Sequence, residues 1–272
     1  MLSPKYIKMR EFENNGTTIN HHIEGKGEIT LLFVHGAYID QSYWAAQVDF
    51  FKRDYTVVTL DLAGHGKSGR SRADWSIEGL ADDIVALIKY HQLEKVILIG
   101  HSLGADLNLI AATKFPDPVI GFIVVDNFKN VATPLAPEFQ AQVGGIIDSL
   151  RKDFAGTNEQ YARMALVSAN TPLSVTDRIV ADYRNTYEPL GQATMPEFFK
   201  LDQIEKALLP LLKLKIYLIN VSYYPTNVEA LQKNAVHGFE LKEIAGTCHY
   251  PMIEHPDAFN EALNDTINAI RL

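Results

Sequence analysis

The stretch VILIGHSLG, residues 96–104, joins an apolar run to a Gly-x-Ser-x-Gly pattern. The run at 96–99 predicts a strand buried on both faces, and the residues after it predict a helix from Ser102 to about Lys114. Between a strand and a helix, the two glycines permit a tight turn that holds Ser102 above the carboxyl edge of a sheet. We therefore expect Ser102 to be a nucleophile. The alternative is an ordinary strand-to-helix turn in which Ser102 is the N-cap.

Strands and helices alternate around this segment. Asn14-Asn15-Gly16 predicts a hairpin turn, and apolar residues at helical spacing after Ser76, a suitable N-cap, predict a helix. Strands are expected at residues 6–13, 17–24, 29–34, 55–60, 96–99, 120–125, 215–221 and 239–244. Phe259 and Leu263 mark a closing helix. This alternation predicts an α/β fold with a parallel sheet and helices on both of its faces.

The alternation stops between residues 128 and 209, where we find only helical signals. One long apolar stripe runs from Phe139 to Phe154, and a second runs from Val175 to Tyr187. We expect residues 128–209 to form a helical cap over the sheet, inserted after the sixth strand. Residues 1–127 and 210–272 then form the core.

Four segments resemble the α/β-hydrolase superfamily in its serine-hydrolase branch: LLFVHGAYIDQSYW, VVTLDLAGHGKSG, VILIGHSLGA and GTCHYPMIEHPDAF. They occur in the family's order and at its usual spacing, over nearly the whole chain, and the resemblance is weakest in the cap. It implies the α/β-hydrolase fold, with a mostly parallel eight-stranded sheet flanked by helices, and a Ser–acid–His triad. Similar proteins are esterases, lipases, lactonases, carbon–carbon bond hydrolases and cofactor-free haloperoxidases. Dehalogenases and epoxide hydrolases of this fold need an aspartate at position 102 and are disfavoured.

His249 is the expected catalytic base among the nine histidines of the chain. It lies between the last predicted strand and the last helix, and its surroundings match the family's catalytic histidine segment. A loop at that place can carry an imidazole to the nucleophile. The alternative is a histidine in a surface loop. His101 points away from its neighbour Ser102 in such a turn, so we expect a structural role for it.

Two backbone amides are the expected oxyanion donors. The amide of Leu103 lies at the start of the helix, where it can point toward a developing oxyanion. Family members take the second donor from the loop after His35-Gly36, so we assign Ala37, with Tyr38 as the alternative. The segment at 61–68, which includes His65, is a family marker that we interpret as structural.

The triad acid is the residue on which the chain departs from the common family pattern. Many relatives carry an aspartate after the next-to-last strand, but this chain has Ser222 about there and no carboxylate between Asn220 and Asn227. The family also uses the end of the strand that follows the nucleophile helix, and Asp126 lies there. We therefore expect Asp126 to be the acid. The alternative is a strand-end aspartate that caps the first turn of the cap.

Bulk properties narrow the function classes. A net charge of -8 over 272 residues argues against nucleic acid and anionic lipid as partners. Cys248 is the single cysteine, so an intrachain disulfide is excluded, and no cluster of ligating residues has metal-binding spacing. We expect no metal and no cofactor. Without a signal-peptide core or an apolar stretch that could span a membrane, the sequence predicts a soluble, cytoplasmic monomer or homodimer with a small-molecule substrate.

The cap supplies the residues that could line a substrate pocket. We expect most of them to pack within the cap and a few to face the sheet edge: Phe139, Tyr161, Met164, Tyr183, Tyr187, Phe198 and Phe199. Such a lining favours a small, apolar acyl group. The predicted function is a serine hydrolase that cleaves an ester, thioester or lactone. The alternatives are a carbon–carbon bond hydrolase with the same triad and a ligand-sensing protein with little turnover.

Overall fold

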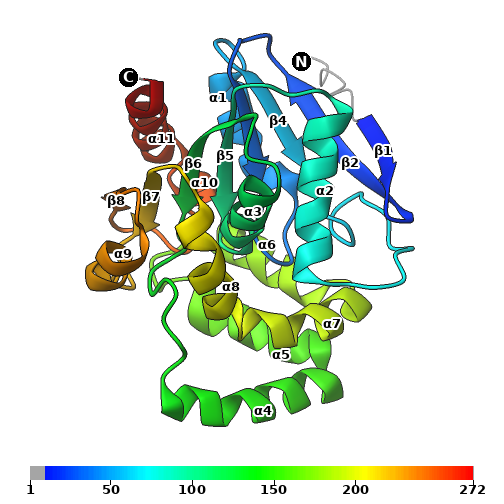
Figure 1. Ribbon diagram of the computed structural model, residues 1–272. Helices are drawn as coiled ribbons and strands as arrows, with labels where there is room; N and C mark the ends of the chain where they lie inside the picture. The colour runs from blue at the N-terminus through cyan, green and yellow to red at the C-terminus, as the bar shows by residue number, and fades with distance from the viewer. Residues whose placement is uncertain (1–9, 272) are drawn as a thin grey trace.

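The computed structural model describes residues 10–271 and contains one eight-stranded sheet with the order β1-β2-β4-β3-β5-β6-β7-β8 (Figure 1). The strands are β1 (Arg10–Asn14), β2 (Thr17–Glu24), β3 (Thr30–Val34), β4 (Thr56–Leu60), β5 (Val96–His101), β6 (Val119–Val125), β7 (Ile216–Val221) and β8 (Phe239–Ile244). β1 and β2 pair antiparallel, as do β2 and β4, and all the other pairs are parallel. The predicted fold class is therefore confirmed. Residues 6–9 of the first predicted strand lie outside the described residues.

The helices that belong to the α/β core cover the sheet. They are α1 (Ala45–Phe51), preceded by the short η1 (Gln41–Trp44), α2 (Ile77–Tyr90), α3 (Leu103–Lys114), α9 (Val228–Asn234), α10 (Pro251–Glu254) and α11 (Pro256–Arg271). α2 and α3 pack together on one face, and α1 contacts α11 on the other (Figure 1). The Ser76 hydroxyl accepts a hydrogen bond from the amide of Gly79, as the predicted N-cap of α2 should.

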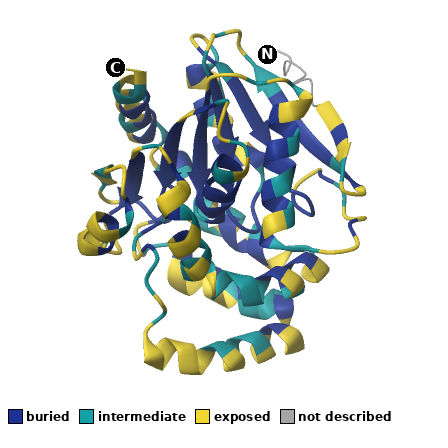
Figure 2. Cartoon of the chain, viewed as in Figure 1, coloured by how far each residue is buried: buried dark blue, intermediate teal, exposed yellow. Residues whose placement is uncertain are grey.

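The centre of the sheet is the core of the molecule. Every residue of β3, β5 and β7 is buried, which explains why these strands read as continuous apolar runs (Figure 2). The carboxyl ends of the parallel strands converge on one edge. Among residues 10–271, none of the helices is long and apolar enough to cross a membrane.

A helical insertion separates β6 from β7, as predicted. It contains α4 (Pro137–Lys152), α5 (Phe154–Tyr161), the π-helical turn η2 (Ala162–Leu166), α6 (Leu173–Arg184), α7 (Glu188–Phe198), α8 (Leu201–Leu208) and η3 (Leu209–Leu211). We call this insertion the cap. It lies below the carboxyl edge of the sheet in Figure 1.

The prediction of one long stripe from Phe139 to Phe154 was wrong. α4 ends before Asp153, whose backbone is non-helical and whose carboxylate accepts the amide of Gly156 as the N-cap of α5. On α4 only Leu150 is buried, and Figure 2 shows the rest of this helix largely exposed. The stripe is therefore split between two helices that point in different directions.

Candidate active site

The turn around Ser102 has the strained geometry of a nucleophile elbow. Ser102 has φ 50° and ψ −128°, a conformation that only a strongly constrained turn imposes on a residue with a side chain. A Cβ on Gly100 would lie 2.4 Å from the carbonyl oxygen of Gly104, and one on Gly104 would lie 2.4 Å from that of Val34. Both glycines are thus required by close backbone approach. The Ser102 side chain makes no capping hydrogen bond to α3, which argues against the N-cap interpretation.

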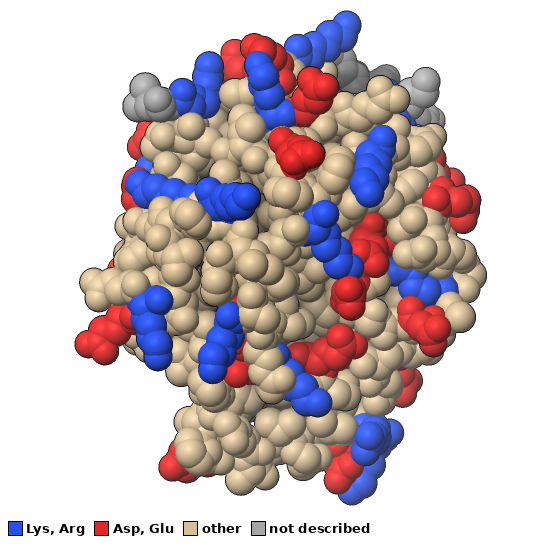
Figure 3. Space-filling view, in the orientation of Figure 1, with Lys and Arg blue, Asp and Glu red and all other residues tan. Residues whose placement is uncertain are grey.

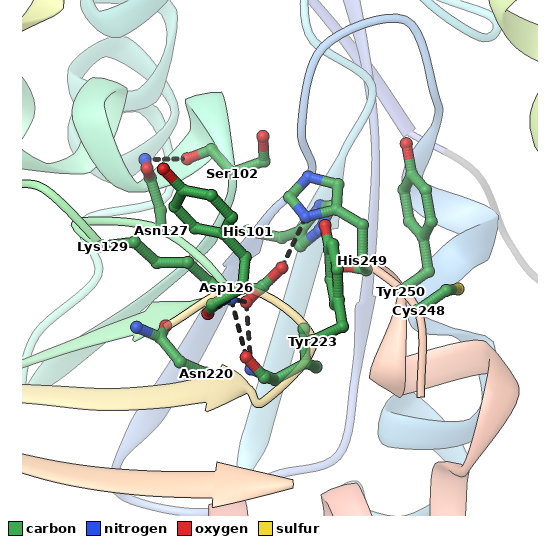
Figure 4. Close-up of polar contacts among 12 residues, drawn as sticks. His101, Ser102, Asp126, Asn127, Lys129, Asn220, Tyr223, Cys248, His249 and Tyr250 are labelled. Carbon is green, nitrogen blue, oxygen red and sulfur yellow. Dashed lines mark hydrogen bonds and ion pairs between the residues drawn. The ribbon is translucent and has the colours of Figure 1, made fainter. Parts of the chain in front are cut away.

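Asp126 and His249, which are far apart in the sequence, lie in direct contact. His249 Nδ1 is 2.6 Å from Asp126 Oδ2 (Figure 4). Asp126 follows β6 with a φ of 45°, and its side chain is 1% exposed. Burial opposes ionisation of this carboxyl, but His249 and then Lys129 outweigh it, so that the pKa of Asp126 lies below its usual value. The carboxylate can therefore hold the Nδ1 proton of His249 and leave Nε2 as a base.

The loop that carries His249 is held from two sides. The His101 ring donates from Nε2 to the backbone oxygen of His249 at 2.9 Å, and the amide of His249 donates to Leu166 O in η2 at 3.2 Å. Burial lowers the pKa of His101 well below its usual value, so the ring is neutral. His101 thus has the structural contact that the sequence predicts, and the cap takes part in positioning the histidine loop.

The loop after β3 packs against the elbow. A Cβ on Gly36 would lie 2.8 Å from His101 Nδ1 and 3.0 Å from Ser102 Cβ. Neither the Ala37 amide nor the Leu103 amide donates a backbone hydrogen bond within residues 10–271, so both are available to an oxyanion. Tyr38, the alternative donor, has a φ of 65°.

The segment at 61–68 makes structural contacts. Asp61 accepts the amides of Gln41 and Lys67, each at 2.9 Å. His65 is buried, its Nδ1 contacts Ala63 O at 3.0 Å, and burial lowers its pKa to about 3. A neutral ring held in this way suits the structural interpretation.

The end of β7 carries no carboxylate, but its backbone contacts Asp126, the proposed acid. The amide of Val221 donates to Asp126 Oδ1 at 3.0 Å. The next residue, Ser222, is exposed, and its amide donates to Ile244 O at 3.3 Å. The two places that the sequence offered for the acid are therefore neighbours in space, and Asp126 lies at one of them.

Three cap residues face the oxyanion loop. The Tyr38 ring lies 5.3 Å from Tyr183, 6.1 Å from Phe198 and 6.2 Å from Phe154, measured between ring centroids. These rings form an aromatic wall beside the site. Of the seven cap residues that the sequence singles out, Tyr183 is buried and Tyr187, Phe198 and Phe199 are half-buried, whereas the other three are exposed. Exposed fractions reach 41% for Phe139, 52% for Tyr161 and 75% for Met164.

Sequence reasoning missed two polar residues directly after Asp126. Asn127 donates from Nδ2 to Ser102 O and to Asp106 Oδ2, each at 2.7 Å. Lys129 is bonded to Asp126 itself. Their place close to the predicted acid was the available signal. The partners of Asn127 and the backbone oxygens that Lys129 also contacts are distant in the chain, so no local pattern could identify these bonds.

Asn127 contacts Asp106, which forms a buried pair of acids with Glu205 between the core and the cap. Asp106, on α3, shares a hydrogen bond with Glu205 on α8, and Glu205 also accepts the amide of Ala132. Two carboxyl groups can bond only when one keeps its proton. Burial and then the charge of Glu205 raise the pKa of Asp106 well above its usual value, and burial also raises that of Glu205.

We expect this pair to make the protein less stable at alkaline pH. A carboxyl whose pKa is raised on folding stabilises the native state at low pH, and this contribution is lost as pH rises through the folded-state pKa. Glu205→Gln can keep both hydrogen bonds without the shared proton. Between pH 6 and pH 9 the wild type should therefore lose about 3–5 °C more in Tm than the variant. Thermal unfolding monitored by circular dichroism, with exposed Glu138→Gln as the matched control, measures this. Equal pH dependence of wild type and Glu205→Gln would contradict it.

Acidic and basic side chains are interspersed on the surface. On the face shown in Figure 3, basic and acidic side chains alternate, without a continuous basic patch. Within residues 10–271, no group of three or more His, Cys, Asp or Glu residues could hold a metal ion. The site therefore consists of the elbow, the Asp126–His249 pair and the two free amides.

Comparison with known proteins identifies the family of this chain. The model of the "Alpha/beta hydrolase family" matches residues 31–262. The chain belongs to the alpha/beta hydrolase family. A solved thermophilic esterase from Thermogutta terrifontis has a TM-score of 0.81 to this chain at 20% identity, covering 97% of this chain and all of the esterase chain. At that identity the likeness shows the fold alone.

Curated relatives in the family match only part of their own length. The 2-(acetamidomethylene)succinate hydrolase of Mesorhizobium japonicum is 30% identical over 142 residues, which cover 52% of this chain and 51% of that protein. Human Protein ABHD8 is 35% identical over 117 residues, which cover 42% of this chain and 26% of that protein. The chain thus spans about half or less of the length of these relatives.

Proposed function

We propose that this alpha/beta hydrolase is a serine hydrolase that cleaves a small, apolar ester, thioester or lactone. The observation that carries the proposal is the 2.6 Å contact between His249 Nδ1 and Asp126 Oδ2, together with the strained Ser102, whose amide donates at 3.0 Å to the oxygen of Val125, the residue before Asp126. A neutral imidazole that donates its Nδ1–H in a hydrogen bond to a carboxylate presents an unprotonated Nε2. That nitrogen is the base that a serine nucleophile requires.

In the proposed reaction, Ser102 Oγ attacks the carbonyl carbon and His249 Nε2 takes the hydroxyl proton. The amides of Leu103 and Ala37 bind the oxyanion of the tetrahedral intermediate. His249 then returns the proton to the leaving group, which departs and leaves an acyl ester on Ser102. His249 then takes a proton from a water molecule as the water oxygen attacks that ester; the bond to Ser102 Oγ breaks, His249 returns the proton to Oγ, and the acid is released. Asp126 remains ionised throughout and stabilises the imidazolium.

The aromatic wall supports an apolar acyl group. Tyr183, Phe198 and Phe154 belong to the cap and pack around the Tyr38 ring of the oxyanion loop. An apolar acyl group could bury its surface against these rings, and the rings themselves are rigid and lose little conformational entropy on binding.

Turnover of p-nitrophenyl acetate and butyrate tests the proposal, with a panel of acyl lengths, lactones and thioesters to define the substrate. Release of nitrophenolate that depends on Ser102 supports it. Activity on a carbon–carbon bond substrate alone would favour the variant chemistry. Tight ligand binding without turnover of any member of the panel would overturn it in favour of a ligand-sensing protein.

We expect no requirement for a metal ion. The proposed steps use a serine, an imidazole and two amides and need no Lewis acid. Dialysis against EDTA should leave kcat and KM unchanged, measured with the best ester of the panel. A strong loss of activity that zinc restores would contradict the serine mechanism.

A further inference from the structure

Lys129 fills the space between the proposed acid and the β7–α9 loop. Its Nζ lies 2.8 Å from Asp126 Oδ1 and donates to the backbone oxygens of Val221 at 2.7 Å and Tyr224 at 2.8 Å (Figure 4). An ammonium group has three N–H donors, and here each has an acceptor. The side chain is only 12% exposed, so these bonds are largely shielded from water.

Two aromatic rings complete the surroundings of the ammonium. Nζ lies 4.9 Å from the centroid of the Tyr223 ring and 6.0 Å from that of Tyr224. Rings at these distances stabilise a cation. The Tyr223 hydroxyl also reaches Ala165 O in the cap at 3.4 Å. Lys129 therefore ties the end of β6 to the β7–α9 loop, which in turn contacts the cap.

The contacts of Asp126 are divided between its two oxygens. Oδ1 takes Lys129 and the Val221 amide, and Oδ2 takes only His249 Nδ1 among the described partners. Two donors on Oδ1 fix the plane of the carboxylate and thereby aim Oδ2 at the imidazole. Removing Lys129 leaves a single amide to hold that orientation.

We propose that Lys129 is a positioning residue of the active site, which holds Asp126 in the orientation that His249 needs and limits how strongly the carboxylate favours the imidazolium. Lys129 touches Asp126 and not the reacting atoms, so it acts through the acid. The inference rests on the proposed function in one respect, that Asp126 is the acid of the triad. Asp126 supplies the carboxylate that Ser222 lacks, and Lys129 links this acid to the end of β7.

The other titratable groups that face the Asp126–His249 pair are neutral. Burial lowers the pKa of His101, raises that of Cys248 to about 12, and raises those of Tyr223 and Tyr250. Among these facing groups, Lys129 is the cation. Its loss should favour protonation of the imidazole, and a protonated imidazole cannot act as a base.

The test compares Lys129→Met with Lys129→Arg, which keeps the charge. Lys129→Met should lower kcat on a p-nitrophenyl ester by about 10–100-fold with little change in KM. The acid limb of its pH–rate profile should move to higher pH by about one pH unit. Lys129→Arg should restore most of kcat and the position of the limb. Lys129→Gln provides a second neutral variant if Lys129→Met does not fold.

Lys215→Met is a matched control. Lys215 also pairs with a carboxylate, Glu240 at 3.0 Å, and also lies over a tyrosine ring, that of Tyr217 at 4.8 Å. It directly precedes β7, at the opposite end of the strand from Val221, so its loss should change neither kcat nor the pH profile. A merely structural Lys129 would show a lower Tm with an unchanged pH profile.

A readout independent of turnover separates this inference from the proposed function. The proton between His249 Nδ1 and Asp126 should give a far-downfield imidazole N–H resonance in ¹H NMR, assigned by its absence in His249→Asn. We expect Lys129→Met to shift or broaden it and Lys129→Arg to keep it. An inactive wild type with that pattern would overturn the proposed function alone. Unchanged resonance, kcat and acid limb in folded Lys129→Met, or equal impairment of the Arg variant, would overturn the role of Lys129.

Discussion

Replacing Ser102 with alanine should reduce kcat on the best ester by on the order of 10⁴-fold or more. The oxyanion amides and the Asp126–His249 pair remain in this variant, but without Oγ no acyl-enzyme can form. The fold should be unaffected, because the Ser102 side chain makes no capping hydrogen bond to α3. The measurement is steady-state hydrolysis of p-nitrophenyl esters by wild type and variant, with thermal unfolding as the check on folding.

A fluorophosphonate probe tests the same residue chemically. It should label wild-type Ser102, as mapped by mass spectrometry of the peptide that contains residues 96–104, and should leave Ser102→Ala unlabelled. Ser149→Ala, on the exposed helix α4, is the matched control and should retain labelling and activity. Labelling at another serine, or none in an active preparation, would count against Ser102 as the nucleophile.

Asp126→Asn should keep the fold and lose about 10²–10⁴-fold in kcat. The Asn side-chain oxygen can still accept from Lys129 and the Val221 amide. Its amide nitrogen, however, must face His249, where it favours the tautomer with the proton on Nε2 and so removes the base. The measurement is kcat/KM across the pH range for wild type and variant.

Two further variants sharpen this test. Asp83→Asn alters another buried ion pair, with Arg72 at 2.6 Å and away from Ser102, and should lower Tm while leaving kcat near the wild-type value. Ser222→Asp added to Asp126→Asn should recover part of the lost activity, because a carboxylate beside Val221 is within reach of the same imidazole. Ser222→Asp alone should change little, or harm the protein slightly through repulsion of two carboxylates. A folded, almost fully active Asp126→Asn would falsify the assignment of the acid.

The elements of the core could be predicted because their signals are local. Continuous apolar runs predict strands covered on both faces, and Ser76 caps α2 through a residue three positions along the chain. The elbow is local as well, since Gly100 and Gly104 flank Ser102 within one turn. The predicted bounds match those of β2 and β8 and differ by one or two residues for the other strands where they are described, because hydrogen bonding rather than apolarity decides where a strand ends.

The interior of the cap was less predictable. Helical spacing from Phe139 to Phe154 cannot reveal that Asp153 caps a new helix, because a cap depends on a backbone conformation that the surrounding packing selects. Helical spacing also does not show whether an apolar stripe packs against another part of the protein or stays exposed to solvent. The apolar stripe of α4 has one fully buried residue, Leu150, and its other residues are half-buried or exposed, whereas Tyr183 of α6 is buried against the oxyanion loop.

The sequence by itself therefore determined the α/β class, the position of the insertion and the candidates Ser102, His249 and Asp126. Only the tertiary structure decided that Asp126 contacts His249, that Lys129 joins Asp126 to the end of β7, and that Asp106 meets Glu205 in the cap. The reason is physical. Periodicity and turn chemistry act between residues a few positions apart, whereas a hydrogen bond between residues 123 positions apart exists only once the sheet has brought two strand ends together.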